Sequence, residues 1–128
     1  MQAYPRIALT VFAFTLYAGG AFGESTEVML SACRPIAKAE IFEDKVTIPQ
    51  DFPAGTCWGA FAVLQEIIRH TDRGRRVYSI CAPANSTRSQ LIAVFVDYTG
   101  KNPQRLHEDF FNVAVDSLRV SFPCETGR

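Results

Sequence analysis

The sequence contains few histidines and none of the common catalytic motifs. His70 and His107 are the only two histidines in 128 residues, and they lie far apart along the chain. No Ser/His/Asp order, no His-Glu-x-x-His sequence and no glycine-rich phosphate loop is present. His107, Glu108 and Asp109 are adjacent, but neighbouring residues on a helix point in different directions and do not converge. These absences predict a non-enzymatic protein. For His107, a role in fixing the turn between two helices is then favoured over catalysis.

An excess of one charge is absent too. Thirteen Lys and Arg residues balance thirteen Asp and Glu residues, so the formal net charge is zero. A nucleic-acid-binding protein needs a basic field, so we expect no nucleic-acid partner. The cysteines include no Cys-x-x-Cys pair, which argues against a metal site. We therefore expect neither a metal ion nor a cofactor.

Long hydrophobic runs are confined to the N-terminus. Met1–Arg6 carries one positive charge, Ile7–Leu16 is almost wholly apolar, and Ala21-Phe22-Gly23 places small residues where a signal peptidase cleaves. This pattern predicts a signal peptide over residues 1–23 and one exported domain over residues 24–128. A retained membrane anchor is the alternative, although the run is shorter than the roughly 20 residues of a spanning helix.

Four cysteines in the expected mature chain predict two disulfides, because exported small domains use even numbers of cysteines in this way. An alternating up-and-down order of the helices puts Cys81 and Cys124 at one end of the molecule. That order leaves Cys33 to pair with Cys57, although a kink at Pro35 would permit another of the three connectivities.

The segment 81–124 predicts a helical hairpin. Thr87 and Gln90 match a capping box at the start of its first helix. Asn102 followed by Pro103 predicts the N-cap and first residue of its second helix, which should end before Pro123. Apolar residues follow i, i+3, i+4, i+7 spacing in both helices: Leu91, Val94, Phe95 and Tyr98, then Leu106, Phe110, Val113, Ala114 and Leu118.

A first helix is expected near the start of the mature chain. Ser25 or Thr26 can cap a helix that begins near Glu27. Pro35 lies inside the apolar pattern and should kink this helix or end its first part.

A second long helix is expected to open at Gly55 and Gly59 and to end near His70. The preceding stretch Thr47–Pro53 contains two prolines and is expected to be non-helical. Each glycine costs roughly 1 kcal/mol in a helix interior, so we expect another backbone to pack closely there. The fold class is therefore all-α, a small bundle of about four helices stapled by two disulfides.

Short motifs occur in a fixed order along the mature chain. They are Cys33; Gly55-Thr56-Cys57-Trp58-Gly59; Cys81-Ala82-Pro83 with Thr87 and Gln90; Tyr98, Pro103 and His107; and Phe122-Pro123-Cys124. Together they resemble the Rap/Tai family of immunity proteins, which neutralise amidase effectors of type VI secretion. The chain differs from the family pattern at Ala60-Phe61 and Val63-Leu64, where members usually have a tyrosine and a further glycine. It also has Asn102 where many have a histidine.

The resemblance implies a periplasmic, helical, homodimeric protein that binds a cognate cell-wall amidase and blocks its active-site cleft. The motif residues outside the cysteines are expected to be structural: Gly55, Gly59, Pro83, Gln90, Tyr98, Pro103, His107 and Pro123.

Two loops are candidates for partner contact, because functional residues favour loops on a rigid scaffold. Their charged residues are Glu43, Asp44, Asp51, Arg73, Arg75 and Arg76. A solvated loop is the alternative for such a charge run. At the level of function, a periplasmic acid-stress chaperone is the alternative to an immunity protein, and a small secreted hydrolase would need a catalytic cluster that the sequence lacks.

Overall fold

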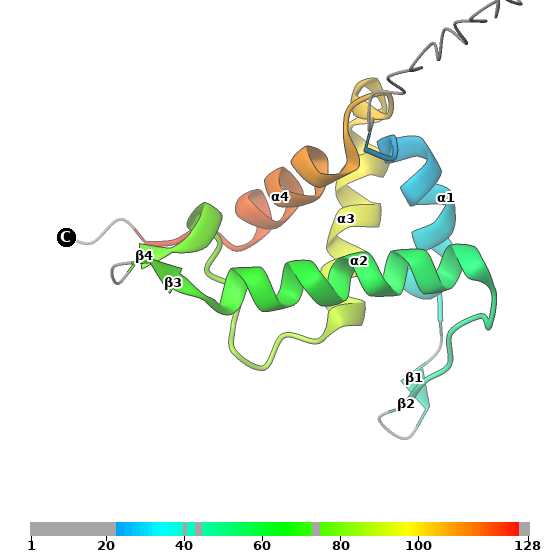
Figure 1. The fold of residues 1–128 in the computed structure, drawn as a ribbon, viewed down its shortest axis with the longest axis horizontal. Coiled ribbons are helices and arrows are strands. Elements are labelled where there is room, and N and C mark those ends of the chain that lie inside the picture. Colours follow the sequence, from blue (N-terminus) through cyan, green and yellow to red (C-terminus); the bar gives the residue numbers. More distant parts are fainter. Residues whose placement is uncertain (1–22, 40, 43–44, 73–74, 126–128) are drawn as a thin grey trace, which may run out of the picture.

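Four helices form the body of the protein in the computed structural model, which describes residues 23–39, 41–42, 45–72 and 75–125 (Figure 1). They are α1 (Thr26–Ala37), α2 (Phe52–Arg69), α3 (Arg88–Lys101) and α4 (Phe110–Ser121). Two antiparallel hairpins pair β1 (Ile41–Phe42) with β2 (Lys45–Val46) and β3 (Thr71–Asp72) with β4 (Arg75–Arg76). Short 3-10 turns occupy Val77–Ser79 and Pro103–Arg105. The predicted all-α class is confirmed.

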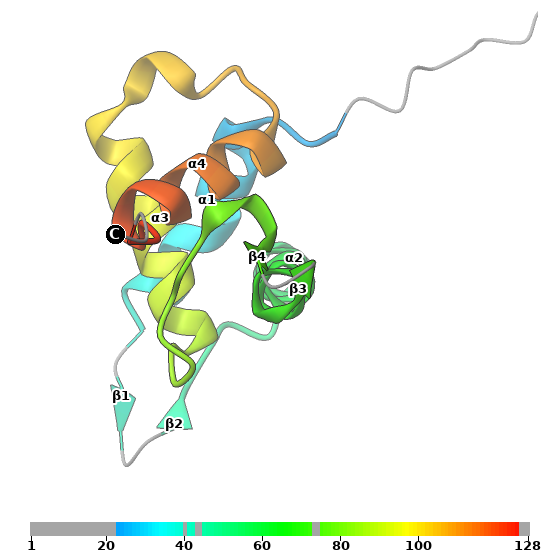
Figure 2. The same cartoon turned by 90° about the vertical axis from the view of Figure 1, so that its left-hand side faces the viewer.

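Helix α3 lies in the middle of the bundle and packs against the other three helices. Helix α2 runs across the bundle, and the two hairpins lie at its opposite ends (Figure 1). The β1–β2 hairpin projects away from the helices (Figure 2). The fold therefore presents two separate loop regions on one helical frame.

Helix α1 begins where the sequence predicts. Ser25 is the N-cap, and its hydroxyl accepts a hydrogen bond from the amide of Val28 at 3.4 Å. Pro35 lies inside the helix, which ends two residues later at Ala37. The proline therefore limits the length of α1 without breaking it earlier.

Helix α2 begins earlier than predicted. Asp51 is its N-cap, with Oδ1 accepting from the amide of Ala54 at 2.8 Å, and Phe52 and Pro53 form the first turn. The expectation that residues up to Pro53 are non-helical is therefore wrong at its C-terminal end. The reason is that proline is favoured in the first helical turn, where its missing amide leaves no bond unmade.

Helix α3 has the predicted capping box. The amide of Gln90 donates to Thr87 Oγ1 at 3.2 Å, and the amide of Thr87 donates to Gln90 Oε1 at 2.8 Å. Gln90 thus completes the capping box of α3.

Helix α4 begins seven residues later than predicted. Pro103 opens only a 3-10 turn, and the helix starts at Phe110 with Asp109 as its N-cap. Asp109 Oδ1 accepts from the amides of Phe111 and Asn112. The expected N-cap, Asn102, instead donates from its side-chain amide to the carbonyl oxygen of Tyr98 at 2.8 Å and ends α3.

Three aromatic rings from three helices form the centre of the core. The centroids of Phe61 and Phe95 are 5.6 Å apart, and Phe110 lies 5.8 and 5.3 Å from them, respectively. Phe61 and Phe95 are fully buried. These tilted and edge-to-face pairs fit the preferred geometry of aromatic rings, and they join α2, α3 and α4.

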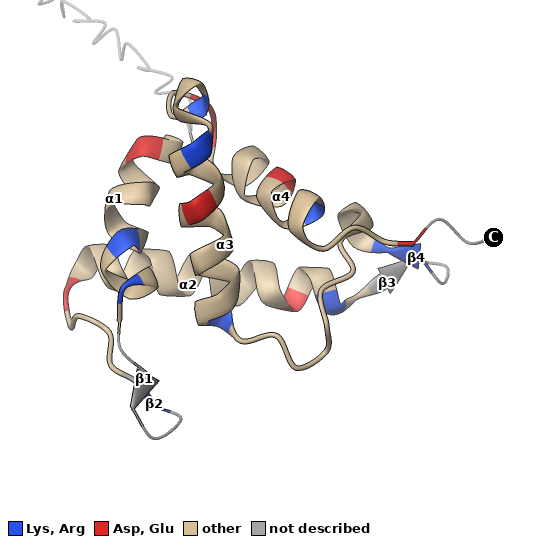
Figure 3. Ribbon diagram, turned by 180° about the vertical axis from the view of Figure 1, so that it is seen from behind, with Lys and Arg blue, Asp and Glu red and all other residues tan. Residues whose placement is uncertain are grey.

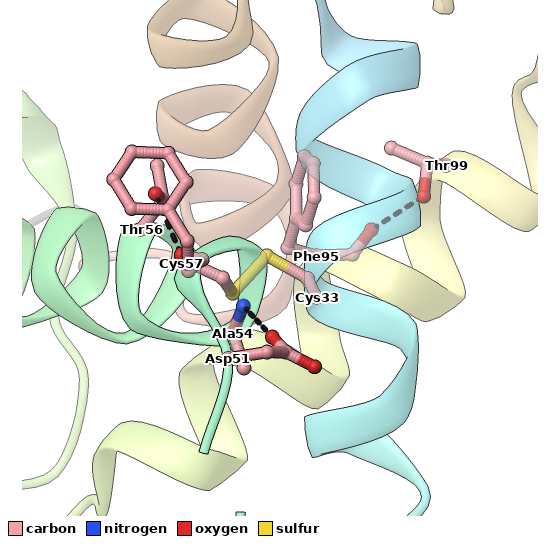
Figure 4. Close-up of a disulfide and its surroundings, with 8 residues drawn as sticks. Cys33, Asp51, Ala54, Thr56, Cys57, Phe95 and Thr99 are labelled. Atoms are coloured by element: carbon pink, nitrogen blue, oxygen red, sulfur yellow. Dashed lines mark hydrogen bonds between the residues drawn. A yellow bond between two sulfur atoms is a disulfide. The ribbon is translucent and has the colours of Figure 1, made fainter. Parts of the chain in front are cut away.

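Both predicted disulfides are confirmed. Cys33 pairs with Cys57 and joins α1 to the first half of α2, close to the Asp51 cap and to Phe95 (Figure 4). Cys81 pairs with Cys124 and joins the start of the segment before α3 to the end of α4. Among the described helices, none combines the length and the hydropathy that a bilayer-spanning segment needs.

Candidate functional site

The three adjacent polar residues after the 3-10 turn have different surroundings. Glu108 pairs with Arg105, Asp109 caps α4, and the His107 side chain is exposed. His107 makes no hydrogen bond with the other described side chains, so its expected role in fixing the turn is not visible in them. Glu108 and Asp109 are therefore used by an ion pair and a helix cap, and the three residues do not converge as an acid–base cluster.

Arg105 is the centre of a half-buried polar cluster. Its guanidinium donates to both carboxylate oxygens of Glu108 at 2.9 and 2.7 Å, to Asp116 Oδ2 at 2.9 Å and to Tyr98 Oη at 2.8 Å. The hydrogen bonds from Arg105 lower the pKa of Glu108, and those to Glu108 and then Asp116 raise the pKa of Arg105. Tyr98 thus has a structural role, and the cluster ties the segment before α4 to both flanking helices.

The glycines expected to pack against another backbone do not do so within this chain. A Cβ built at Gly55 or at Gly59 would have no atom within 4 Å, and both residues are exposed. The close-packing prediction is therefore wrong for the isolated chain. Pro83 is also exposed, whereas Pro123 pairs in an isolated bridge with Ile80 beside the second disulfide.

The outer face of α2 is apolar and uncharged. No Asp, Glu, Lys or Arg occurs between residues 52 and 65. Phe52 is 86% exposed and Val63 is 61% exposed, and the two bare glycines lie between them on the same helix face. A groove of about 580 Å³ between α1 and the start of α2 adjoins this face, with Val28, Met29 and Ala32 among its lining residues. We call the exposed residues Phe52, Gly55, Gly59 and Val63 the α2 face.

Of the predicted contact residues in the loop region at the β1–β2 end, one, Asp51, lies within the described part of the chain. Asp51 is exposed, although its carboxylate is used as the cap of α2. Glu43 and Asp44 lie outside the described residues. At this end, the β1–β2 hairpin projects from the helices (Figure 2).

The loop region at the β3–β4 end brings the predicted arginines to the surface. Arg75 and Arg76 are both exposed, and Arg73 lies outside the described residues. Arg76 Nη1 donates to the carbonyl oxygens of Ile68 and Arg69, at 3.5 and 3.2 Å, and so caps the C-terminal end of α2. The hairpin is thereby held against the helix that it follows.

The turn after β4 has an unusual backbone conformation that the sequence did not indicate. Tyr78 and Ser79 have φ angles of 58° and 55°, in the left-handed region. Each such residue costs about 1–2 kcal/mol when it is not glycine. The chain turns at these two residues, directly before Ile80 pairs with Pro123.

Three side chains beside this turn complete a mixed basic and aromatic surface. The Tyr78 ring packs edge-on against Phe111, with centroids 5.7 Å apart, and Arg119 Nε donates to the Tyr78 carbonyl oxygen at 3.1 Å. Tyr78 and Phe111 are 42% and 37% exposed. We call Arg75, Arg76, Tyr78, Phe111 and Arg119 the arginine–tyrosine end. Arg119 and Phe111 carry no local sequence signal for this role, because their contact with Tyr78 spans more than thirty positions of the chain.

Comparison with protein families gives one clear result. The family model described as Rap1a immunity proteins matches residues 30–124. The search of curated proteins and the search of solved structures found no match. The matched residues include all four disulfide cysteines and most of the four helices. Because this match covers well over half of its length, the chain belongs to the family of Rap1a immunity proteins.

Proposed function

We propose that the chain acts in the periplasm and binds a cognate secreted cell-wall amidase, whose active-site cleft it occludes. The family match carries this proposal, because it assigns an immunity role against a secreted effector. The two disulfides support the oxidising compartment. The pattern of residues 1–23 supports export through a cleavable signal peptide.

Blocking of an active-site cleft requires no catalytic residues, and this agrees with the structural roles of the acidic residues in the described part of the chain. The acidic residues Glu108, Asp109 and Asp116 stabilise the fold through ion pairs and a helix cap. The loop regions lie at the ends of a stapled helical frame, where they can differ between relatives without disturbing the core (Figure 1). An inhibitor needs this arrangement, since its specificity comes from surface contacts rather than from reacting groups.

A second copy of the chain is proposed to cover the α2 face. The glycines leave the helix surface bare and cost stability in the isolated chain, which is offset if another backbone approaches them. Phe52 forms one wall of the groove, whose lining is mostly apolar and also includes Glu24 and Glu27, so the same surface carries both a protruding ring and a recess. A twofold contact places one patch against itself, which requires such self-complementarity. The absence of charge from residues 52–65 also suits a homodimer interface.

A protection assay tests the immunity function. Each secreted hydrolase encoded near this chain is exported to the periplasm of a sensitive strain, with and without the full chain. We expect rescue from lysis by one amidase and not by the others. A variant without residues 2–23 serves as the control, because it should not protect if the chain acts after export.

The chaperone alternative predicts a different result. A periplasmic chaperone would suppress aggregation of unrelated proteins at acidic pH and would protect weakly against many insults. Rescue from several unrelated hydrolases, or from none while acid aggregation is suppressed, would contradict the immunity proposal.

A further inference from the structure

The turn Val77–Ser79 is held in its strained conformation by contacts with α4 and by the residues that follow the turn. Arg119 bonds the Tyr78 carbonyl oxygen, and the Tyr78 ring rests on Phe111. Directly after the turn, Ile80 is fully buried and pairs with Pro123. The next residue, Cys81, donates its amide to the Phe122 carbonyl oxygen at 2.8 Å and carries the disulfide. The position of the tyrosine is thus fixed before any partner arrives, which lowers the entropic cost of binding.

The exposed rings at this turn contribute little to the hydrophobic core. The core cluster includes Phe61, Phe95 and Ile80, but neither Tyr78 nor Phe111 belongs to it. Strained residues persist where the surrounding structure determines them, and they concentrate at functional positions. The fold therefore keeps an exposed tyrosine in a strained backbone conformation, although the tyrosine ring does not stabilise the hydrophobic core.

Three arginines belong to the segments next to this turn: Arg75 and Arg76 precede it in the chain, and Arg119 bonds the Tyr78 carbonyl oxygen. Arg75 and Arg76 are exposed on β4, and Arg119 lies in the last turn of α4. The C-terminal end of α4 and β4 lie on the same side of the molecule (Figure 3). Of the acidic side chains on α4 and the segment after it, Asp116 is shared between Arg105 and Arg119, and Glu125 is exposed. Tyrosine and arginine are the residues most enriched among binding hot spots. Their combination here fits a negatively charged protein surface.

We propose that the arginine–tyrosine end is the surface by which the chain binds its effector, and that it meets an acidic patch on that protein. This inference rests on the proposed function and adds to it which end of the molecule is used. Tyr78 acts as the central anchor, and Arg75 and Arg119 flank it as charged contacts. The β1–β2 hairpin, at the other end of α2, lies outside the contact (Figure 1).

The test compares two variants at this end with a matched variant at the other. Arg75→Glu and Lys45→Glu make the same charge change at exposed residues of β4 and β2. Tyr78→Ala removes the anchor. The probe is the amidase against which the wild-type chain protects, purified with its catalytic nucleophile replaced. Dissociation constants are measured by titration calorimetry, and folding is checked by circular dichroism.

We expect a clear difference between the two ends. Tyr78→Ala should weaken binding about 30-fold or more, as hot-spot truncation does. Arg75→Glu should weaken it about 10-fold or more and slow association, whereas Lys45→Glu should change it less than about 2-fold. Raising the salt concentration from about 50 to about 300 mM should slow association of the wild type and have a smaller effect on Arg75→Glu.

Each contrary outcome has a separate meaning. No protection by the wild-type chain would remove the proposed function itself. If the wild-type chain protects but folded Tyr78→Ala and Arg75→Glu bind the amidase as tightly as wild type does, the proposed function stands. The proposal that the arginine–tyrosine end is the binding surface is then contradicted. Loss of binding in Lys45→Glu alone would overturn it too and would point to the β1–β2 end. Association that does not respond to salt would contradict an acidic partner surface.

Discussion

The backbone amide and the side-chain hydroxyl of Thr26 both donate to one acceptor, the carbonyl oxygen of Glu108, at 2.9 and 3.0 Å. Two neighbouring bonds extend this contact: the amide of Glu27 donates to Leu106, and that of Phe110 donates to Glu24. The first turn of α1 is thereby fixed to the segment that leads into α4. Since Thr26 is fully buried, the contact is shielded from water.

Removal of the Thr26 hydroxyl tests the weight of this contact. Thr26→Val keeps the shape and leaves the Glu108 carbonyl with one donor, so it should lower the free energy of unfolding by about 1 kcal/mol. Ser31→Ala is the control, because its exposed hydroxyl bonds only within α1, to the carbonyl oxygen of Glu27. Chemical denaturation measures both. Equal effects of the two variants would contradict a special role for Thr26.

The pKa of Glu108 predicts how stability depends on pH. Its pKa is lowered in the folded protein by the hydrogen bonds from Arg105, so the unfolded chain binds the proton more readily. The contribution is therefore complete above the ordinary glutamate pKa of about 4.3 and is lost as pH falls through the lower folded value. Thermal melts between about pH 2 and pH 7 should show a shallower acid decline for Glu108→Gln than for wild type. Parallel curves would contradict this assignment.

Loss of the first disulfide should destabilise the bundle without changing its fold. It closes a 24-residue separation, for which loop entropy predicts about 3.5 kcal/mol. The double variant Cys33→Ala/Cys57→Ala avoids a free thiol and should unfold at lower denaturant concentration with the same helical content. The matched double variant at Cys81 and Cys124 opens a 43-residue separation, for which about 4 kcal/mol is expected. A smaller cost for the longer separation would show that strain or residual structure dominates.

Relief of backbone strain should stabilise the protein at one position. Ser79 has a φ of 55°, which glycine adopts freely. Ser79→Gly recovers about 1–2 kcal/mol of strain and loses about 0.4–1 kcal/mol through a more flexible unfolded chain, so a net gain of about 0.5–1 kcal/mol is expected. Denaturation of the variant beside wild type measures it. A net loss would show that the hydroxyl or the turn geometry contributes more than the strain costs.

The α2 face makes a prediction about oligomeric state. Val63→Lys places a charge within the proposed contact and should convert the dimer to a monomer in sedimentation or light-scattering experiments. Val120→Lys is the control, since Val120 is similarly exposed, at 66%, but lies on α4. A monomeric wild type, or a dimer that tolerates Val63→Lys, would contradict the proposed interface.

Local signals in the sequence predict the helix starts that depend on neighbouring residues. Ser25 before α1, and Thr87 with Gln90 before α3, cap through bonds that span three positions. The two disulfides also follow, because alternating helices bring the paired cysteines to the same ends. The helix caps need no knowledge of distant contacts, and the disulfide pairing needs only an assumed order of the helices.

The start of α4 could not be predicted locally, because partners from the other end of the chain decide it. A helix starting at Pro103 would need the Leu106 carbonyl oxygen to accept from the amide of Phe110. That oxygen instead accepts from Glu27, and the Phe110 amide donates to Glu24. Tertiary hydrogen bonds thus replace those of a helical turn. The helix therefore does not start at Asn102-Pro103, although the local sequence favours a start there.

Only some residues of the candidate contact surface could be predicted from the sequence, for the same reason. Arg75 and Arg76 were identified as a charge run, but the residues that make their surroundings specific come from α4. Nothing near Phe111 or Arg119 in sequence indicates that a strained tyrosine from another segment will rest on them.

The position of the second disulfide has a consequence for when the protein can work. Cys81 lies two residues after Ser79, the last residue of the strained turn, and its bond to Cys124 holds the turn beside the end of α4. A newly made chain that is still reduced lacks this tie, and the turn is then free to relax. Oxidation would therefore act as a maturation step: the proposed binding surface would become complete only after the chain reaches an oxidising compartment.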